Sequence, residues 1–152
     1  MNRIQIRAEG LPLPPWTEAA KGYVKKVLDI KGFKNWELSV LFCNNSYIKT
    51  LNAQYRSKDE ATDVLSFPLG EYSPAGYFLA GDIVISLDAL KENSGFFKVS
   101  HDEELRRLLV HGLLHLSGED HKTNNAGESM LKCQEEILKA IPQSIIIREE
   151  MP

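Results

Sequence analysis

Three of the four histidines of the chain stand in one short stretch, HGLLHLSGEDH, which runs from His111 to His121. His111 and His115 are four residues apart, so on a helix their rings project from one face and can bind one metal ion. Gly118 lets the chain turn after the helix, and His121 then supplies a third nitrogen ligand. Three imidazoles without a fourth protein ligand are typical of catalytic zinc sites. Zinc is the expected metal, although imidazole also suits nickel, cobalt, iron and copper.

A glutamate that this spacing usually brings is missing. The stretch matches the metzincin pattern HExxHxxGxxH at both later histidines and at the glycine, but Gly112 stands in place of the glutamate. In metalloproteases that glutamate is the general base, so its absence argues against peptidase chemistry and leaves the metal site intact. Asp120 is the candidate to move a proton or to orient a ligand ring, and Glu119 is a weaker one.

The segments around the motif predict two helices. Ser100 to Glu103 fits the capping box S-x-x-E, so the first helix is expected from about His101 to Leu116. A last helix is expected from about Ala126 to Ala140, closed by Pro142. One side of it carries Met130, Leu131, Gln134, Ile137, Leu138 and Ile141. The pattern does not place the apolar tail at 145–147.

Upstream of these helices, strand and helix patterns alternate. RIQIR near the N-terminus predicts a half-buried strand, and Thr17 is expected to cap a helix that ends at Gly32. Residues 36–42 (WELSVLF) predict a second strand. Asn44 or Asn45 should then cap a short helix that turns Ile48, Leu51 and Tyr55 inward.

Two further apolar runs, DVLSF at 63–67 and GDIVIS at 81–86, predict strands. Between them we expect a loop of about a dozen residues, which is either disordered or borders a functional site. These elements imply a small twisted sheet with helices packed on it, in an α+β or mixed α/β domain.

Length and composition favour one soluble domain. A chain of 152 residues with 43% hydrophobic content can bury one sizeable core, so a single domain over 1–152 is expected. We expect no secretory signal, because the start MNRIQIRAEG has no apolar h-region, and no membrane partner, because no apolar run approaches about 20 residues. A cytoplasmic protein is therefore expected. Cys43 and Cys133 are far apart in sequence, which favours free structural thiols over a disulfide.

Charge is distributed unevenly along the chain. The net charge of -3 argues against a general nucleic-acid binder. Residues 1–58, however, carry ten Lys/Arg and four Asp/Glu, whereas the remainder carries eight and seventeen. The asymmetry permits a basic surface able to meet phosphates, although a solvated helix face is an equally good interpretation. The candidate residues are Lys21, Lys25, Lys26, Lys31, Lys34, Lys49, Arg56 and Lys58.

The stretch HGLLHLSGEDH is similar to the HGxLHLxGxDH motif of the YbeY family of bacterial single-strand-specific metallo-endoribonucleases, which are rRNA maturation factors. LNAQYRSKDEATDVLSFP at 51–68 and GDIVIS also resemble that family, so the resemblance spans most of the chain. It implies a zincin-like α+β domain, with a small, mostly parallel mixed sheet of about four strands and about five helices. Ala61 stands where the family often has proline, which affects only the local loop.

The resemblance implies cleavage of single-stranded RNA in maturation of the 16S rRNA 3′ end and in ribosome quality control. The ribosome and its assembly factors would be partners, with no nucleotide cofactor. The family's metal ligands carry over onto His111, His115 and His121. Its functionally important arginine carries over onto Arg56, which by itself is most simply a surface residue at a helix end.

Residues near the predicted third strand have two interpretations. Thr62, Asp63 and Ser66 are candidate substrate-binding residues along a cleft beside the metal, or they form a turn and a strand. Tyr55, Tyr72 and Tyr77 either stack on unpaired bases or serve packing.

Two other functions remain open. The first is a metallopeptidase of altered mechanism, favoured by the histidine spacing and disfavoured by Gly112. The second is a non-catalytic ribosome-assembly factor with a structural metal. An open three-histidine site argues against the second function, because structural zinc usually has four protein ligands.

Overall fold

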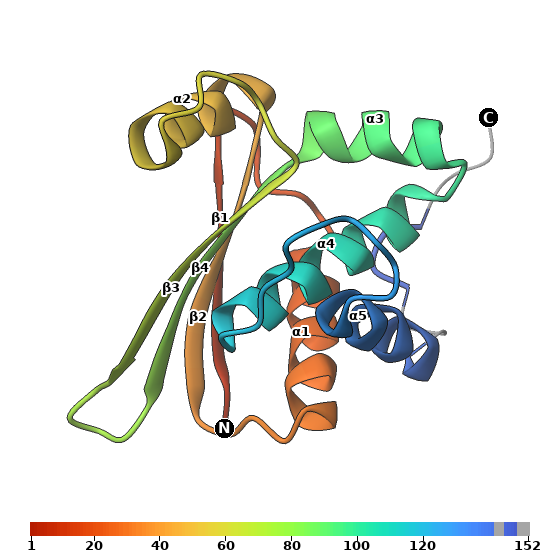
Figure 1. Cartoon of the computed structure of the whole chain (residues 1–152). Helices are drawn as coiled ribbons and strands as arrows, with labels where there is room; N and C mark the ends of the chain where they lie inside the picture. Colours follow the sequence, from red (N-terminus) through yellow and green to blue (C-terminus); the bar gives the residue numbers. More distant parts are fainter. Residues whose placement is uncertain (142–144, 149–152) are drawn as a thin grey trace.

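The computed structural model describes residues 1–141 and 145–148 and has an α+β fold (Figure 1). Its elements are β1 (Arg3–Glu9), α1 (Thr17–Ile30), β2 (Trp36–Cys43), α2 (Asn45–Arg56), β3 (Val64–Tyr72), β4 (Phe78–Ser86), α3 (Leu87–Phe97), α4 (His101–Leu116) and α5 (Ser129–Ala140). Among these described helices, none is long and apolar enough to cross a membrane.

The four strands form one mixed sheet in the order β1-β2-β4-β3. The strands β1, β2 and β4 are parallel, and β3 lies antiparallel to β4 at one edge. Parallel neighbours need a long crossover, and α1 supplies it between β1 and β2. The predicted fold class, with four strands and five helices, is therefore confirmed.

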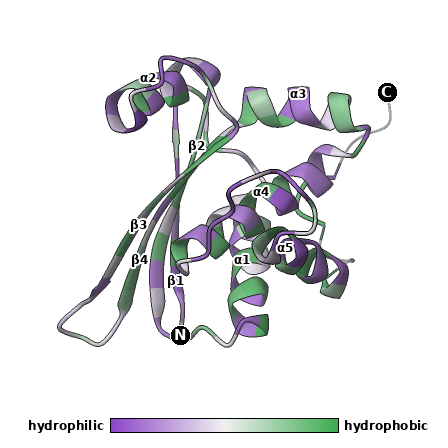
Figure 2. Ribbon diagram, in the orientation of Figure 1, coloured by the Kyte–Doolittle hydropathy of each residue, from purple (hydrophilic) through white to green (hydrophobic). Residues whose placement is uncertain are grey.

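Helices cover the two faces of the sheet unequally. Side chains alternate between faces along a strand, so Val40 and Phe42 of β2 join a large core while Leu41 and Cys43 join a smaller one. The helices α1, α4 and α5 pack on the large core and α2 on the small one (Figure 1). Purple and green stretches alternate along the helices in Figure 2, as expected when one side of each helix is apolar.

The helix α4 has the predicted bounds and cap. Ser100 Oγ accepts the backbone N–H of Glu103 at 3.0 Å, and Gly118 turns the chain with a φ of 100°. At Gly112 the helix α4 packs closely on β4: a Cβ there would lie 2.8 Å from Cγ2 of the buried Ile83. The missing side chain at position 112 thus also serves helix–sheet packing.

The prediction of a loop of about a dozen residues between the third and fourth strands was wrong. The strands extend to Tyr72 and from Phe78, which leaves a tight turn at 73–77. Pro68 and Gly70 are residue types typical of loops, so the sequence pattern did not indicate that the strands continue through this region. Proline is tolerated because β3 is an edge strand, and Gly70 has a φ of 72° beside a register shift. The tip of the hairpin points away from α4 (Figure 1).

Several local predictions need correction. Thr17 is the first residue of α1 rather than its cap, because Trp16 takes the cap position and its carbonyl accepts the N–H of Ala20. Tyr55 does not point inward. The residue is 60% exposed, and its ring packs edge to face on that of Phe67 in β3, with ring centroids 5.4 Å apart.

Three features of the C-terminal half were predicted incorrectly or not at all. The last helix begins at Ser129, three residues later than expected, and ends at Ala140 as predicted, while the closing Pro142 lies outside the described residues. The sequence pattern gave no range for α3, which follows β4 directly. The apolar tail at 145–147 lies against α4, where the backbone N–H groups of Ile146 and Ile147 donate to the carboxylate of Asp102.

The two cysteines are free, as predicted. Cys43 is buried, and burial raises the pKa of its thiol to about 12. This thiol therefore stays protonated and packs as a small apolar group.

Candidate metal centre and its cleft

The three histidines of the motif lie together. Ring centroids are 4.8 Å apart for His111 and His115, 5.1 Å for His111 and His121, and 5.5 Å for His115 and His121. One potential ligand atom from each lies within 4.8 Å of the others. The helix α4 supplies two rings and the loop that follows it supplies the third, as the spacing predicted.

Hydrogen bonds orient two of the rings. His111 Nδ1 pairs with Gln134 Oε1 at 2.8 Å, and His121 Nδ1 pairs with the carbonyl of Thr123 at 2.8 Å. In both rings Nε2 remains available to a metal. Burial lowers the pKa of His111 and His115, which favours the neutral form that binds metals. The donor set therefore fits one transition-metal ion.

Gln134 belongs to a chain of polar contacts across α4 and α5. It is 6% exposed, and its Nε2 donates to Glu135 at 3.0 Å, which fixes the direction of the amide. Glu135 in turn accepts two hydrogen bonds from Arg107, both at 3.0 Å. The sequence analysis placed Gln134 on the apolar side of the last helix. A glutamine among apolar residues was the signal for a buried hydrogen-bonding role.

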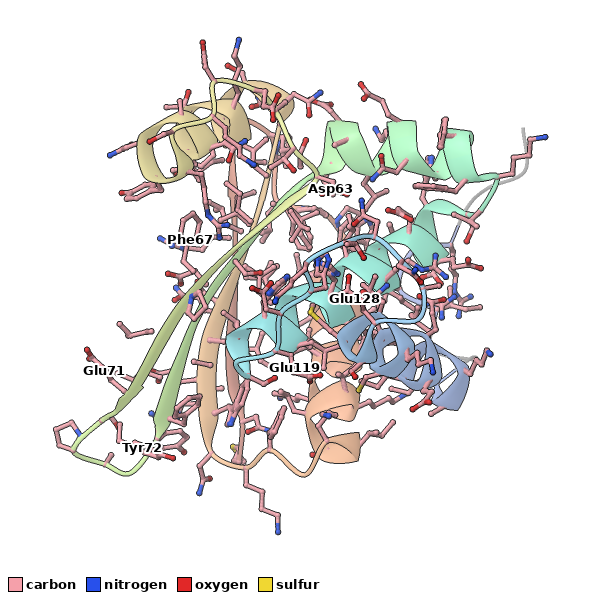
Figure 3. The ribbon with its side chains drawn as sticks, viewed as in Figure 1. Asp63, Phe67, Glu71, Tyr72, Glu119 and Glu128 are labelled. Carbon is pink, nitrogen blue, oxygen red and sulfur yellow. The ribbon has the colours of Figure 1, made fainter. Side chains whose placement is uncertain are left out.

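The loop that carries His121 is anchored by Glu128, a residue that no sequence motif indicated. Its carboxylate accepts the N–H of Lys122 at 2.9 Å and that of Thr123 at 2.5 Å (Figure 3). The hydroxyl of Thr123 also donates to this carboxylate, and that hydrogen bond, followed by those from the backbone, lowers the pKa of Glu128. Glu128 thus holds the Thr123 carbonyl in place, and that carbonyl orients His121.

Arg56 reaches the histidines from the opposite side of a cleft. Its Nη2 donates to the carbonyl of Ser66 at 2.9 Å, which fixes the guanidinium against β3. A cavity of about 360 Å³ lies between β3 and the end of α4, and Arg56, Ser66, His111 and His115 line it. The remaining guanidinium N–H donors can bind an anion placed beside the two rings.

The open edge of β3 faces this cleft and is partly capped by side chains. The carbonyl of Asp63 accepts the N–H of Ser86 in β4, so backbone groups of Val64 and Ser66 point to the open edge. There the N–H of Val64 donates to the Asp63 carboxylate, the Ser66 carbonyl accepts from Arg56, and Pro68 has no N–H. These three positions therefore cannot join a continuous hydrogen-bond ladder with another strand.

Asp120 and Glu119 lie at the same cavity. Asp120 Oδ1 accepts the N–H of His121 at 2.8 Å and is 3.8 Å from His115 Nδ1, while 84% of the side chain is exposed. Glu119 lies 3.8 Å from Lys31 Nζ. Asp120 is therefore fixed by the turn yet open to solvent, as a proton-transfer group requires.

Asp63, which directly precedes β3 (Figure 3), lines a second cavity together with His111 and His121. Its Oδ2 accepts from Asn93 at 3.0 Å, and Asn93 also donates to Glu104 at 3.2 Å. Glu104 is 3% exposed, and this burial raises its pKa against the opposing effects of Asn93 and Arg107; Asp63 and Glu103 raise it further. Thr62 lines neither described cavity beside the histidines, and its hydroxyl lies 3.5 Å from Asp63 Oδ1.

The eight candidate cations do not form one basic surface, because α1 and α2 lie on opposite faces of the sheet (Figure 1). Among them, Arg56 lines the cleft. Tyr72 packs near Phe78, with ring centroids 5.3 Å apart, and Tyr77 lies under Arg3 at 3.9 Å. Both tyrosines thus have partners on the hairpin side of the sheet.

Fold and site together define a class of α+β protein in which a histidine cluster and an arginine face one cleft along an edge strand. Residues 4–142 match the family model for Endoribonuclease YbeY. The chain therefore belongs to the Endoribonuclease YbeY family, which are nucleases acting on phosphodiester bonds.

Individual relatives agree with this assignment. Endoribonuclease YbeY of Treponema pallidum is 46% identical over 142 residues, which cover 91% of this chain and 89% of the relative. The protein of the same name from Treponema denticola is 50% identical over 78% of this chain and 79% of its own length. The solution structure of TM1509 from Thermotoga maritima has a TM-score of 0.61 and 29% identity, covering 90% of this chain and 87% of that one.

Proposed function

We propose that this chain is a zinc-dependent endoribonuclease that cleaves single-stranded RNA. One observation carries the proposal: Arg56, fixed by Ser66, lines the same cavity as His111 and His115. An arginine fork and a metal site that face one another suit a phosphodiester, whose charge increases in the transition state. Nitrogen ligands favour zinc, with nickel as the alternative.

The roles of the residues follow from their positions. His111, His115 and His121 would hold the ion, which supplies Lewis-acid polarisation of a phosphoryl oxygen and activation of the attacking oxygen. Arg56 binds the phosphate and stabilises its added charge. Asp120 accepts a proton at its carboxylate, at the mouth of the cavity. Ser66 positions Arg56 through its carbonyl, and Asp63 and Thr62 shape the start of the edge strand.

The same geometry disfavours a peptidase. Peptides commonly bind to a sheet edge through main-chain hydrogen bonds. On β3, side chains of Asp63 and Arg56 already occupy two of the outward groups, and Pro68 lacks a third. A base at position 112 is also excluded, because a Cβ there would meet Ile83.

An assay on three substrates tests the proposal. Purified protein would be given single-stranded RNA, duplex RNA and an unfolded protein, and its metal content would be measured. We expect His115→Ala to lose both the metal and RNA cleavage. Arg56→Ala should keep the metal and lose about 10²- to 10³-fold in kcat. His101→Ala, on the same helix, and Lys49→Ala, on the same helix as Arg56, serve as matched controls and should behave as wild type.

Each contrary result has a definite meaning. Equal RNA cleavage by wild type and His115→Ala would reveal a contaminating nuclease. Loss of proteolysis in His115→Ala would favour the peptidase. A bound metal without cleavage of any RNA would favour a non-catalytic assembly factor.

We further propose that the enzyme acts in the cytoplasm on the ribosome, in maturation of the 16S rRNA 3′ end and in ribosome quality control with assembly factors. The resemblance of the three sequence blocks to the YbeY family supports this role. A bacterium that depends on this chain should accumulate 3′-extended small-subunit rRNA when it carries His115→Ala, as read by sequencing of rRNA ends. Normal 3′ ends in that strain would contradict the proposal.

A further inference from the structure

A second cavity adjoins the histidines on the side away from Arg56. It has a volume of about 820 Å³, within the range of about 300–1,000 Å³ for small-molecule sites. His111 and Val64 line both cavities, and His121 lines the second. A ligand that has one part at the histidines and Arg56 can therefore extend into the second cavity.

The walls of this cavity combine an apolar surface with polar groups. Phe97, Val99, Leu108 and Leu131 supply the apolar part. The ring of Phe97 stands at the end of α3, where the residue is 58% exposed. A flat aromatic ring that borders a cavity beside a metal site is suited to stacking on another flat ring.

The charges of the cavity exclude a phosphate. Among the described residues that line it are the carboxylates Asp63, Glu103, Glu104 and Glu135 and one permanent cation, Arg107. That cation is already paired, since it donates twice to Glu135 and once to Glu103. An anion would meet an excess of carboxylates over cations here, whereas a neutral group with N–H donors would find acceptors. The cavity beside Arg56, by contrast, favours an anion, because the guanidinium of Arg56 lines it.

We propose that the second cavity binds one unpaired nucleobase of the RNA strand whose phosphate lies between Arg56 and the histidines, with that base stacked on Phe97. The inference rests on the proposed function and adds the ligand subsite to it. Each cavity then binds one part of a nucleotide. The phosphate lies in the cavity beside Arg56, and the base lies in the second cavity, whose lining is apolar and acidic.

This assignment gives a physical reason for a preference for single strands. A base that remains paired and stacked in a duplex cannot enter a side cavity, so duplex RNA would first have to release it. A preference for single-stranded over duplex RNA would therefore follow from binding of a base in the second cavity, next to His111.

The experiment compares two neighbouring phenylalanines. Phe97 lines the cavity, whereas Phe96 is 80% exposed and lies outside its lining. Phe96 touches the ring of Phe97 edge to face, with ring centroids 5.0 Å apart, so it tests the support of that ring and not a contact with the ligand. Wild type, Phe97→Ala, Phe96→Ala and Phe97→Trp would be assayed on a short single-stranded RNA with one cleavage site. The same RNA would also carry an abasic residue at each position around that site in turn. Metal content and melting temperature would be measured for every variant.

We expect Phe97→Ala to lose about 5- to 100-fold in kcat/KM, with metal content unchanged, since base–aromatic stacking is commonly this strong. Phe97→Trp should stay near wild type. Phe96→Ala should lose much less than Phe97→Ala, because Phe96 contacts the Phe97 ring and does not line the cavity. One abasic position should reduce wild-type cleavage by a similar factor. On that RNA, Phe97→Ala should cause little further loss, because ring and base would act as one pair.

Two results would overturn the subsite and leave the nuclease proposal standing. The first is wild-type activity of Phe97→Ala on the intact RNA. The second is a full additional loss by Phe97→Ala on every abasic RNA, which would mean that the ring acts on something other than a base. Absence of RNA cleavage by wild type would instead remove the proposed function itself.

Discussion

Replacing Gln134 by leucine removes the hydrogen-bond partner of a metal ligand without removing a ligand. In the structure Gln134 Oε1 lies 2.8 Å from His111 Nδ1, and the amide is fixed by Glu135 and, through it, by Arg107. Leucine has a similar size and accepts no hydrogen bond. The substitution therefore leaves a buried ring N–H of His111 unpaired and its ring free to rotate.

The size of the effect follows from the burial of this contact. Gln134 is 6% exposed, so water does not readily replace its amide. An unsatisfied buried donor costs about 1–3 kcal/mol. Loss of such a partner to a metal-bound histidine commonly lowers metal affinity by about 10- to 100-fold, which is about 1.4–2.7 kcal/mol and agrees with that range. We expect Gln134→Leu to lose zinc affinity by this factor.

Competition with a chromogenic zinc chelator measures this affinity directly. Gln134→Glu retains an acceptor for His111, so it should keep affinity at or above wild type even if repulsion from Glu135 lowers its melting temperature. Glu136→Leu controls for an added leucine on the exposed side of α5. The reasoning is refuted if Gln134→Leu binds zinc as tightly as wild type, or if Glu136→Leu loses as much.

Three further substitutions test separate parts of the account. Arg56→Lys keeps the charge but loses the planar fork, so kcat should fall by about 10- to 100-fold at unchanged metal content, as single-turnover assays can show. Gly112→Ala should lower the free energy of unfolding by ~1 kcal/mol or more in urea, because the clash with Ile83 exceeds the gain in helix propensity; an added Ile83→Val should recover part of it. Burial raises the pKa of Glu104, so its ionisation destabilises the fold as pH rises through that pKa. Glu104→Gln should therefore melt above wild type at pH 7, with the gain vanishing below about pH 4; a lower melting temperature at pH 7 would contradict this.

The histidine cluster was predictable because its geometry is local. Helical spacing fixes His111 and His115 on one face, and Gly118 returns the chain so that His121 joins them. The helix α4 was equally predictable, since its cap and its stop are both encoded within a few residues. The functional role of Arg56 was predicted only from the resemblance to the family. No local pattern shows that the end of α2 contacts β3, because that contact depends on how the sheet is assembled.

Other parts of the structure depend on contacts that sequence patterns do not record. Pro68 and Gly70 resemble loop residues until β3 is known to be an edge strand with a register shift. The role of Gln134 requires α5 to lie against α4, and the cavity beside Phe97 requires five separate segments to meet. Such features arise from tertiary packing, which periodicity within one element cannot indicate.

A metal titration tests the central claim most directly. Protein stripped with a chelator would be titrated with zinc while cleavage of single-stranded RNA is followed. The account predicts no cleavage at first, a rise in proportion to added zinc, and a plateau at about one ion per chain, with His115→Ala inactive throughout. Full cleavage by the stripped protein, or saturation with zinc without any cleavage, would contradict the claim that these histidines form the catalytic metal centre.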